Sequence, residues 1–127
     1  MIVVDTSALM AIALGETKSD ACIEALAHDT EVLISAGTMA EALIVAARRH
    51  IGGVMTDLIE RFDFEIVPVT SASASRIGDA YERWGKGMHS AGLNFGDCFA
   101  YTLAKDQSCP LLFIGGDFSK TDIKSVL

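Results

Sequence analysis

Four acidic residues of this 127-residue chain stand where an apolar segment ends or a helix begins. Asp5 directly follows the run IVV, and Asp117 follows the run PLLFI and two glycines. Glu41 lies in the first turns of the helix expected after the run EVLIS, and Asp97 lies in the first turn of the helix expected within GLNFGDCFAYTLA. These four carboxylates are the side chains whose types and positions are suited to shared chemistry.

Strand-like and helix-like segments alternate along the chain. This order predicts the fold that positions the four acids. Crossover helices between strands are typical of a parallel sheet covered on both faces. We therefore predict an α/β protein: one three-layer α/β/α domain over residues 1–127, with a central, mostly parallel sheet of four to five strands. The expected strands are residues 2–4, 31–35, 64–70 and 110–118, and the expected helices are 8–14, 18–28, 38–51, 55–62, 71–87 and 95–104.

Local patterns suggest how several elements begin and end. Thr6 and Ser7 are candidate N-caps for the first helix. The paired glycines at 52–53 are expected to end the helix that contains Glu41, and Pro68 favours an edge position for its strand. In an open parallel sheet, sites form outside the carboxyl ends of the strands. The acids are therefore expected to converge at that edge.

Each acid also has an ordinary structural interpretation. Asp5 and Asp117 suit turns, Glu41 suits a capping box that starts at Thr38, and Asp97 suits the positive end of a helix dipole. A cluster is costly without cations, because two carboxylates ~5 Å apart repel by about 3 kcal/mol at an effective dielectric constant of ~20. Oxygen ligands favour Mg²⁺ or Mn²⁺ over zinc. The pattern therefore indicates a hard-metal site suited to phosphodiester hydrolysis.

Composition limits the alternatives. The net charge is −7, and it is −3 when the four candidate acids are set aside, so the pattern opposes non-specific adhesion to nucleic acid but not a nuclease. The N-terminus lacks a basic segment, and no apolar run is long enough to span a membrane, so we expect a cytoplasmic protein. The three cysteines, Cys22, Cys98 and Cys109, form no metal-binding pair and are expected to be reduced.

Four segments in matching order resemble the PIN-domain ribonucleases, and more specifically the VapC-type toxins of bacterial toxin–antitoxin pairs. They are MIVVDTSALMAIALGE, MAEALIVAARR, GLNFGDCFAYTLAK and PLLFIGGDFSKTDI. The resemblance implies a metal-dependent endoribonuclease that uses Mg²⁺ or Mn²⁺. It also implies a homodimer, higher toxin–antitoxin assemblies, and a cognate VapB-type antitoxin that blocks the site.

The resemblance assigns roles to individual residues. It implies that the catalytic and metal-binding residues are Asp5, Glu41, Asp97 and Asp117. Thr6 and Ser7 match family hydroxyls that support the first acid, here Asp5, or a bound water. Asp122 also falls in a family motif, where it is expected to cap a helix or to support the metal ligands. For RNA binding, we expect contributions from Lys86, His89, Arg48, Arg49 and Lys120. Tyr81 and Trp84, at helical spacing, are expected in the core or at a dimer surface.

Three other interpretations share parts of this pattern. A signalling receiver domain needs an acceptor Asp at the end of a central strand, but Asp57 lies in a helical stretch. A haloacid-dehalogenase-type phosphatase needs a second Asp where Ser7 stands. The third alternative is a catalytically weak PIN-like module that acts by binding RNA or an antitoxin, and the sequence leaves it open.

Overall fold

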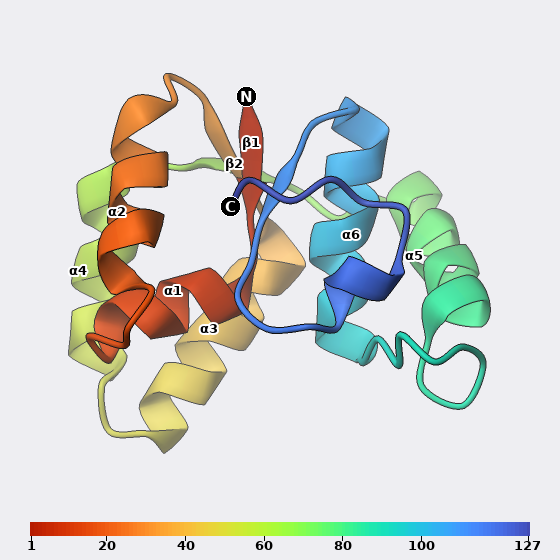
Figure 1. The fold of residues 1–127 in the computed structure, drawn as a ribbon, viewed down its shortest axis with the longest axis horizontal. Helices are drawn as coiled ribbons and strands as arrows, with labels where there is room; N and C mark the ends of the chain where they lie inside the picture. Colours follow the sequence, from red (N-terminus) through yellow and green to blue (C-terminus); the bar gives the residue numbers. More distant parts are fainter.

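The computed structural model describes residues 1–127 and has four short strands and six helices (Figure 1). No helix is long and apolar enough to span a bilayer. The strands are β1 (Ile2–Val4), β2 (Val32–Ser35), β3 (Glu65–Val67) and β4 (Leu111–Leu112). The helices are α1 (Thr6–Ala13), α2 (Ser19–His28), α3 (Ala36–Arg48), α4 (Gly52–Phe62), α5 (Ser71–Trp84) and α6 (Phe95–Gln107), followed by the 3-10 turn η1 (Phe118–Lys120).

The four strands form one parallel sheet in the order β3-β2-β1-β4. Val3 in the centre pairs with Leu33 on one side and with Leu111 on the other. Helices α1 to α4 lie on one side of this sheet and α5 and α6 on the other, which confirms the three-layer prediction (Figure 1). As Pro68 indicated, β3 is an edge strand.

Alternate residues of the strands fill two separate apolar cores. Val4, Ile34 and Leu112 belong to the core under α1 to α4, whereas Val3 and Leu111 belong to the core under α6. All five are fully or almost fully buried. Since both faces of the sheet are covered, the central strand β1 and its neighbour β4 are continuous buried apolar runs, whereas the edge strand β3 is largely exposed.

Three local predictions were wrong. The glycines at 52–53 begin α4 instead of ending α3, because His50 adopts a left-handed conformation (φ 60°) that turns the chain two residues earlier. Asp5, and not Thr6 or Ser7, is the N-cap of α1. The run 110–118 forms a strand of only two residues, since Ile114 donates its N–H to the Ser7 hydroxyl beyond the end of that strand.

Candidate active site

Asp5 lies at the carboxyl end of the central strand β1 and is almost completely buried, with 2% of its surface exposed. Its Oδ2 accepts two hydrogen bonds from Ser7, one from the backbone N (3.0 Å) and one from Oγ (2.7 Å). Its Oδ1 is buried and has no partner in the protein. A buried acceptor without a donor is costly, so this oxygen is suited to a cation or a proton.

Burial raises the pKa of Asp5 to about 7, although the two bonds from Ser7 act in the opposite direction. The charges of Asp97 and Glu41 raise this pKa further, so both carboxylates lie near enough to repel that of Asp5. Such a shift disfavours the ionised form unless a positive charge is present. These shifts indicate that Asp5, Glu41 and Asp97 share one site.

Glu41 reaches this site from the second turn of α3. The capping-box interpretation of Glu41 is wrong, because α3 begins at Ala36 with Ser35 as its N-cap, and Thr38 is buried inside the helix. Glu41 Oε1 instead accepts a hydrogen bond from Thr6 Oγ1 (2.6 Å), at the start of α1. The Glu41 carboxylate also lies against Gly96, in space that a β-carbon there would fill.

Asp97, at the N-terminus of α6, caps this helix and also lies near the other acids. Its Oδ2 accepts the backbone N–H of Asn94 (3.0 Å), and Asn94 Oδ1 accepts that of Asp97 (2.8 Å), which completes a capping box. The structural interpretation of Asp97 as a helix-terminal acid is therefore also correct. Burial raises the pKa of Asp97, and the charges of Glu41 and Asp117 raise it further. The hydrogen bond from Asn94 acts in the opposite direction and lowers this pKa. The second carboxylate oxygen makes no hydrogen bond within the protein.

Asp117 stands apart from the other three acids. It is exposed, precedes η1 and makes no side-chain hydrogen bond or ion pair. Its negative charge raises the pKa of Asp97, whereas the charges that raise the pKa of Asp5 are those of Asp97 and Glu41. Accordingly, no group of three or more acidic, histidine or cysteine side chains is close enough to hold a metal ion as it stands. Mutual repulsion favours such an open arrangement when no cation is bound.

The two hydroxyl residues beside Asp5 connect elements around the site. Ser7 Oγ donates to Asp5 and accepts the N–H of Ile114 (3.0 Å), so it ties the start of α1 to the chain that leaves β4. Thr6 ties α1 to α3 through Glu41. Ser7 thus contacts the first acid, Asp5, whereas Thr6 contacts Glu41.

Asp122 does not join the four acids but a neighbouring network. Tyr101 Oη donates to Asp122 Oδ1 (2.6 Å), and Lys105 Nζ donates to Asp122 Oδ2 (3.1 Å). Burial alone would raise the pKa of Asp122, but these two bonds hold it below its usual value. The pKa of Tyr101 is raised to about 12, first by burial and then by its bond to Asp122.

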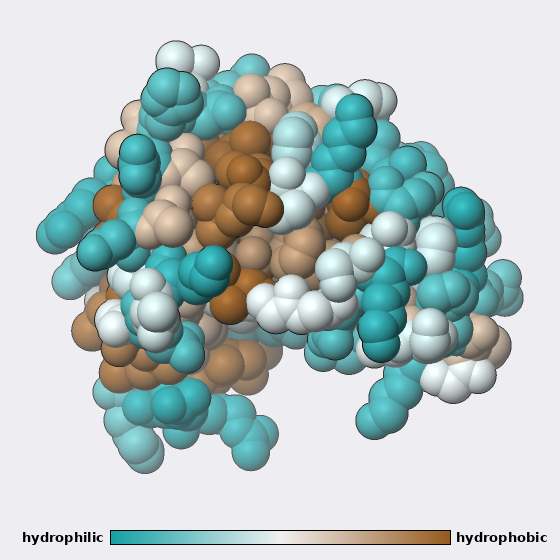
Figure 2. Space-filling model, in the orientation of Figure 1, coloured by the Kyte–Doolittle hydropathy of each residue, from teal (hydrophilic) through white to brown (hydrophobic).

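The predicted RNA-binding residues lie on two flanks of the site. Arg48 and Arg49 are at the C-terminal end of α3, about 10 Å along the helix from Glu41 at 1.5 Å per residue. Figure 2 shows the lower edge of the molecule hollowed between the tip of α3 and the loop after α5. Hydrophilic side chains cover the tip of the left flank and part of the right flank, and apolar side chains lie above that tip on the left. That loop carries Lys86 and His89.

His89 has a structural role in this loop, because its Nδ1 accepts the N–H of Ala91 and its ring packs edge-on against Trp84. Lys120 Nζ contacts the carbonyl oxygen of Ser90 at 3.5 Å and thus links the C-terminal segment to the same loop. Trp84 is buried, as predicted for a core residue.

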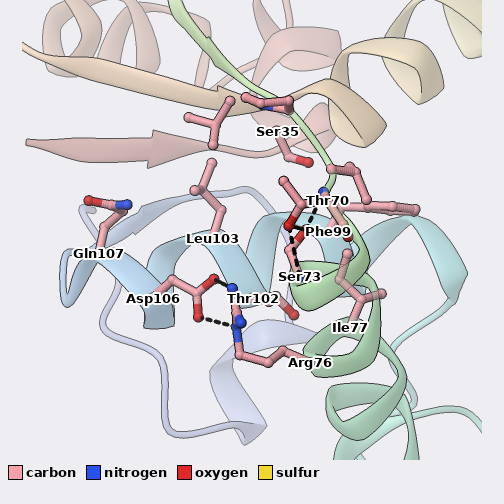
Figure 3. A pocket seen from close by; sticks show the side chains of 13 residues that line it. Ser35, Thr70, Ser73, Arg76, Ile77, Phe99, Thr102, Leu103, Asp106 and Gln107 are labelled. Atoms are coloured by element: carbon pink, nitrogen blue, oxygen red, sulfur yellow. Dashed lines mark hydrogen bonds and ion pairs between the residues drawn. The ribbon is translucent and has the colours of Figure 1, made fainter.

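A hollow of about 460 Å³ lies elsewhere, between α5, α6 and the edge of the sheet (Figure 3). The Arg76 guanidinium and the Asp106 carboxylate close one side of it through two hydrogen bonds of 2.9 and 2.8 Å. None of the four acids lines this hollow. It is therefore separate from the candidate active site.

Two structural features were missed in the sequence. The Asn94–Asp97 capping box was readable from the Asn-x-x-Asp pattern at the start of α6. The need for glycine at position 96 was not readable, because it arises from the packing of α3 against α6.

Comparison with known proteins agrees with this geometry. The PIN domain family model matches residues 2–124. The chain is 41% identical to a protein named Ribonuclease VapC from Mycolicibacterium smegmatis, over 98% of this chain and 99% of the relative. It is 42% identical to Ribonuclease VapC30 from Mycobacterium tuberculosis, over 98% of each.

Solved structures share the fold. VapC20 of Mycobacterium tuberculosis, described as a toxin that cleaves the sarcin–ricin loop, superposes with a TM-score of 0.81 at 18% identity, over 99% of this chain and 98% of that one. FitAcB of Neisseria gonorrhoeae gives a TM-score of 0.70 at 20% identity, over 98% of this chain and 96% of that one.

Proposed function

This chain belongs to the PIN-domain family, and within it to the VapC ribonucleases, and from this premise we propose that it is an Mg²⁺- or Mn²⁺-dependent endoribonuclease. The observation that carries the proposal is the unpartnered Oδ1 of Asp5, buried next to Asp97 and Glu41. Carboxylate oxygens are the preferred ligands of these two cations.

The residues present fit such an ion. Asp5 Oδ1 and the free oxygen of Asp97 would hold it, with Glu41 and Asp117 as further ligands, directly or through water. A bound divalent cation supplies an activated water and stabilises the leaving oxygen of the phosphodiester. Ser7 fixes the direction of the Asp5 carboxylate, and Asn94 fixes that of Asp97. Such preorganisation restricts the directions in which both carboxylates can point.

We extend the proposal to partners. M. smegmatis and M. tuberculosis relatives bear the VapC name, and one solved neighbour is titled a toxin–antitoxin complex from Klebsiella pneumoniae, which supports a VapB-type antitoxin as a partner of this chain. A homodimer is supported by an apolar surface next to the site, where Phe95 is 73% and Ile44 62% exposed. The cytoplasm, where such RNA and antitoxin occur, is the proposed location.

Cleavage of RNA with and without metal tests the proposal. Purified protein free of any antitoxin is incubated with a panel of structured and single-stranded RNAs, with Mg²⁺ or Mn²⁺ and with EDTA. We expect EDTA-sensitive cleavage that falls more than 100-fold in Asp5→Asn and Asp97→Asn, while both variants keep the wild-type circular-dichroism spectrum. Wild-type activity in either variant would overturn the roles assigned to these acids.

The alternative is a catalytically weak module that acts by binding RNA or an antitoxin. The open arrangement of the acids, with Asp117 outside the inner three, is the feature that favours it. RNA binding that persists without any metal-dependent cleavage would support this alternative over the nuclease.

A further inference from the structure

One row of polar residues runs along α6 from the acids toward the C-terminal segment. Asp97, Tyr101 and Lys105 are spaced by four residues and therefore share one face of the helix. Asp97 belongs to the proposed nuclease site, whereas Tyr101 and Lys105 both bind Asp122. Helix α6 therefore carries Asp97 and also holds the segment that follows Asp117.

The Tyr101 hydroxyl is the centre of this connection. It accepts a hydrogen bond from Trp84 Nε1 (2.9 Å) and donates one to Asp122 Oδ1 (2.6 Å). Tyr101 is 6% exposed and Trp84 is 8% exposed. A short bond from a buried phenol to a carboxylate is charge-assisted and geometrically specific. It fixes Asp122 against α6.

Asp122 and Asp117 are joined by one tight turn. The N–H of Thr121 bonds the Phe118 carbonyl oxygen (3.0 Å), and the Thr121 hydroxyl bonds the same oxygen (2.6 Å). The Phe118 ring is buried against Phe113, with ring centres 5.1 Å apart. A shift of Asp122 would therefore be transmitted through this turn to Asp117.

The chain before Asp117 is held mainly by Ser119, which follows it: the Ser119 N–H (3.2 Å) and the Ser119 hydroxyl both donate to the Gly116 carbonyl oxygen. The two glycines themselves give little support. Gly115 has a left-handed conformation (φ 99°), and neither Gly115 nor Gly116 has a side chain to pack. Asp117 itself makes no side-chain hydrogen bond that would fix it. Its position relative to Asp97 therefore depends on the anchors that follow it.

We propose that Tyr101 is a positioning residue of the nuclease site: by binding Asp122, it holds the turn 117–122 and thereby fixes where the carboxylate of Asp117 lies relative to that of Asp97. The inference rests on the proposed function. Tyr101 makes no hydrogen bond to any of the four acids, so its proposed effect is on the placement of Asp117. Its hydroxyl, and not its ring, is the group required.

Tyr101→Phe tests this, because it removes only the hydroxyl and keeps the ring in the core. Hydrogen exchange of the backbone amides of residues 115–121, measured by mass spectrometry without metal, is expected to become about tenfold faster. The Mn²⁺ concentration that gives half-maximal cleavage should rise by about the same factor, with kcat at saturating Mn²⁺ close to that of wild type. Mn²⁺ binding, measured by electron paramagnetic resonance, should weaken in parallel.

Arg76→Gln is the matched control. Arg76 joins the same two helices, α5 and α6, through Asp106, but it does not contact the C-terminal segment. It should leave exchange at 115–121 and the Mn²⁺ dependence unchanged. Asp122→Asn should reproduce the effects of Tyr101→Phe, and the double variant should add little to either single one.

Two outcomes would overturn the inference. One is wild-type exchange and Mn²⁺ binding in Tyr101→Phe; the other is an equal change in Arg76→Gln, which would indicate a general loosening of α5 on α6. If wild-type protein cleaves no RNA, the proposed function fails, but exchange and Mn²⁺ binding still decide whether Tyr101 positions Asp117.

Discussion

The carboxylate of Glu41 lies against Gly96, in the space that the β-carbon of any other residue at position 96 would occupy. Glu41 comes from α3 and Gly96 from the first turn of α6, so this contact brings an acid of one helix next to Asp97 of the other. The missing side chain at position 96 is thus part of the geometry of the acidic site.

Gly96→Ala should displace Glu41 and reduce RNA cleavage. The added methyl group is too close to the carboxylate for both to keep their places, so the Glu41 side chain must rotate away or α6 must shift. We expect a loss in kcat/KM of about 100-fold, since small displacements in catalytic groups are costly. Cleavage of a fixed RNA at saturating Mg²⁺ measures the effect.

Gly78→Ala provides the control for this substitution. Gly78 lies inside α5, and a β-carbon there would meet nothing within 4 Å. It should raise the free energy of unfolding by about 0.5–1 kcal/mol, because alanine is the better helix former, and leave cleavage unchanged. Full activity in Gly96→Ala would mean that Glu41 is not required where the structure has it.

How far the sequence predicts the site differs from residue to residue. Asp5 and Asp97 were predictable, because acids at the ends of parallel strands and at the starts of the helices between them meet at one edge. Glu41 lies near Asp5 and Asp97, but the competing capping box was excluded only by the structure, in which Ser35 is the cap. The choice between two overlapping polar caps depends on where the preceding strand ends.

Features that arise from packing between distant helices could not be predicted. The contact of Glu41 with Gly96 requires the approach of α3 to α6, and the bond of Tyr101 to Asp122 requires the path of the last ten residues. Neither is encoded in local spacing or periodicity. The turn at His50 was missed for a related reason: a non-glycine residue took the left-handed conformation, and the adjacent glycines did not.

The raised pKa of Asp5 predicts how the stability of the metal-free protein depends on pH. Because the folded protein holds this proton up to about pH 7 and the unfolded chain releases it near pH 4, the free energy of unfolding should fall as pH rises through this window. Asp5→Asn should flatten this dependence and be about 1 kcal/mol more stable than wild type at pH 8 without metal.

Thermal melts in EDTA between pH 4 and pH 8 measure this effect. The wild-type protein should stay folded without metal throughout this range, with a lower melting temperature at pH 8 than at pH 5. Addition of Mn²⁺ at pH 8 should restore stability in the wild type but not in Asp5→Asn. A melting temperature that rises steadily toward pH 8 in EDTA would contradict the assignment of a raised pKa to Asp5.

Ser7→Ala should weaken both the fold and the site. The Ser7 hydroxyl donates to Asp5 and accepts from the backbone of Ile114. Its removal leaves the Ile114 N–H without a partner and leaves Asp5 Oδ2 with only the bond from the Ser7 backbone N–H. We expect the free energy of unfolding to fall by about 1–3 kcal/mol, measured by urea titration, together with slower cleavage. Ser75→Ala, at an exposed position in α5, is the control. It should change the free energy of unfolding by no more than about 0.5 kcal/mol and leave the rate of cleavage close to that of wild type.

Lys86 is expected to contact the phosphates of bound RNA. Its backbone N–H bonds the Leu93 carbonyl oxygen (2.9 Å), which holds the residue near the start of α6, and its side chain is exposed and free of any ion pair. Lys86→Gln should therefore raise KM about three- to fivefold without changing kcat. Because each phosphate contact to a single strand contributes about 0.7 to the slope of log affinity against log salt, that slope should become shallower by about this amount.

Arg61→Gln is the charge-matched control for this measurement. Arg61 lies in the last turn of α4, on the opposite side of the sheet from α5 and α6, and is likewise exposed and unpaired. Both variants lower the positive charge by one, so a general electrostatic effect would change RNA affinity equally in the two. Equal changes in KM and in the salt slope in the two variants would show that Lys86 does not contact RNA specifically. A change confined to Lys86→Gln would assign one phosphate contact to the loop after α5.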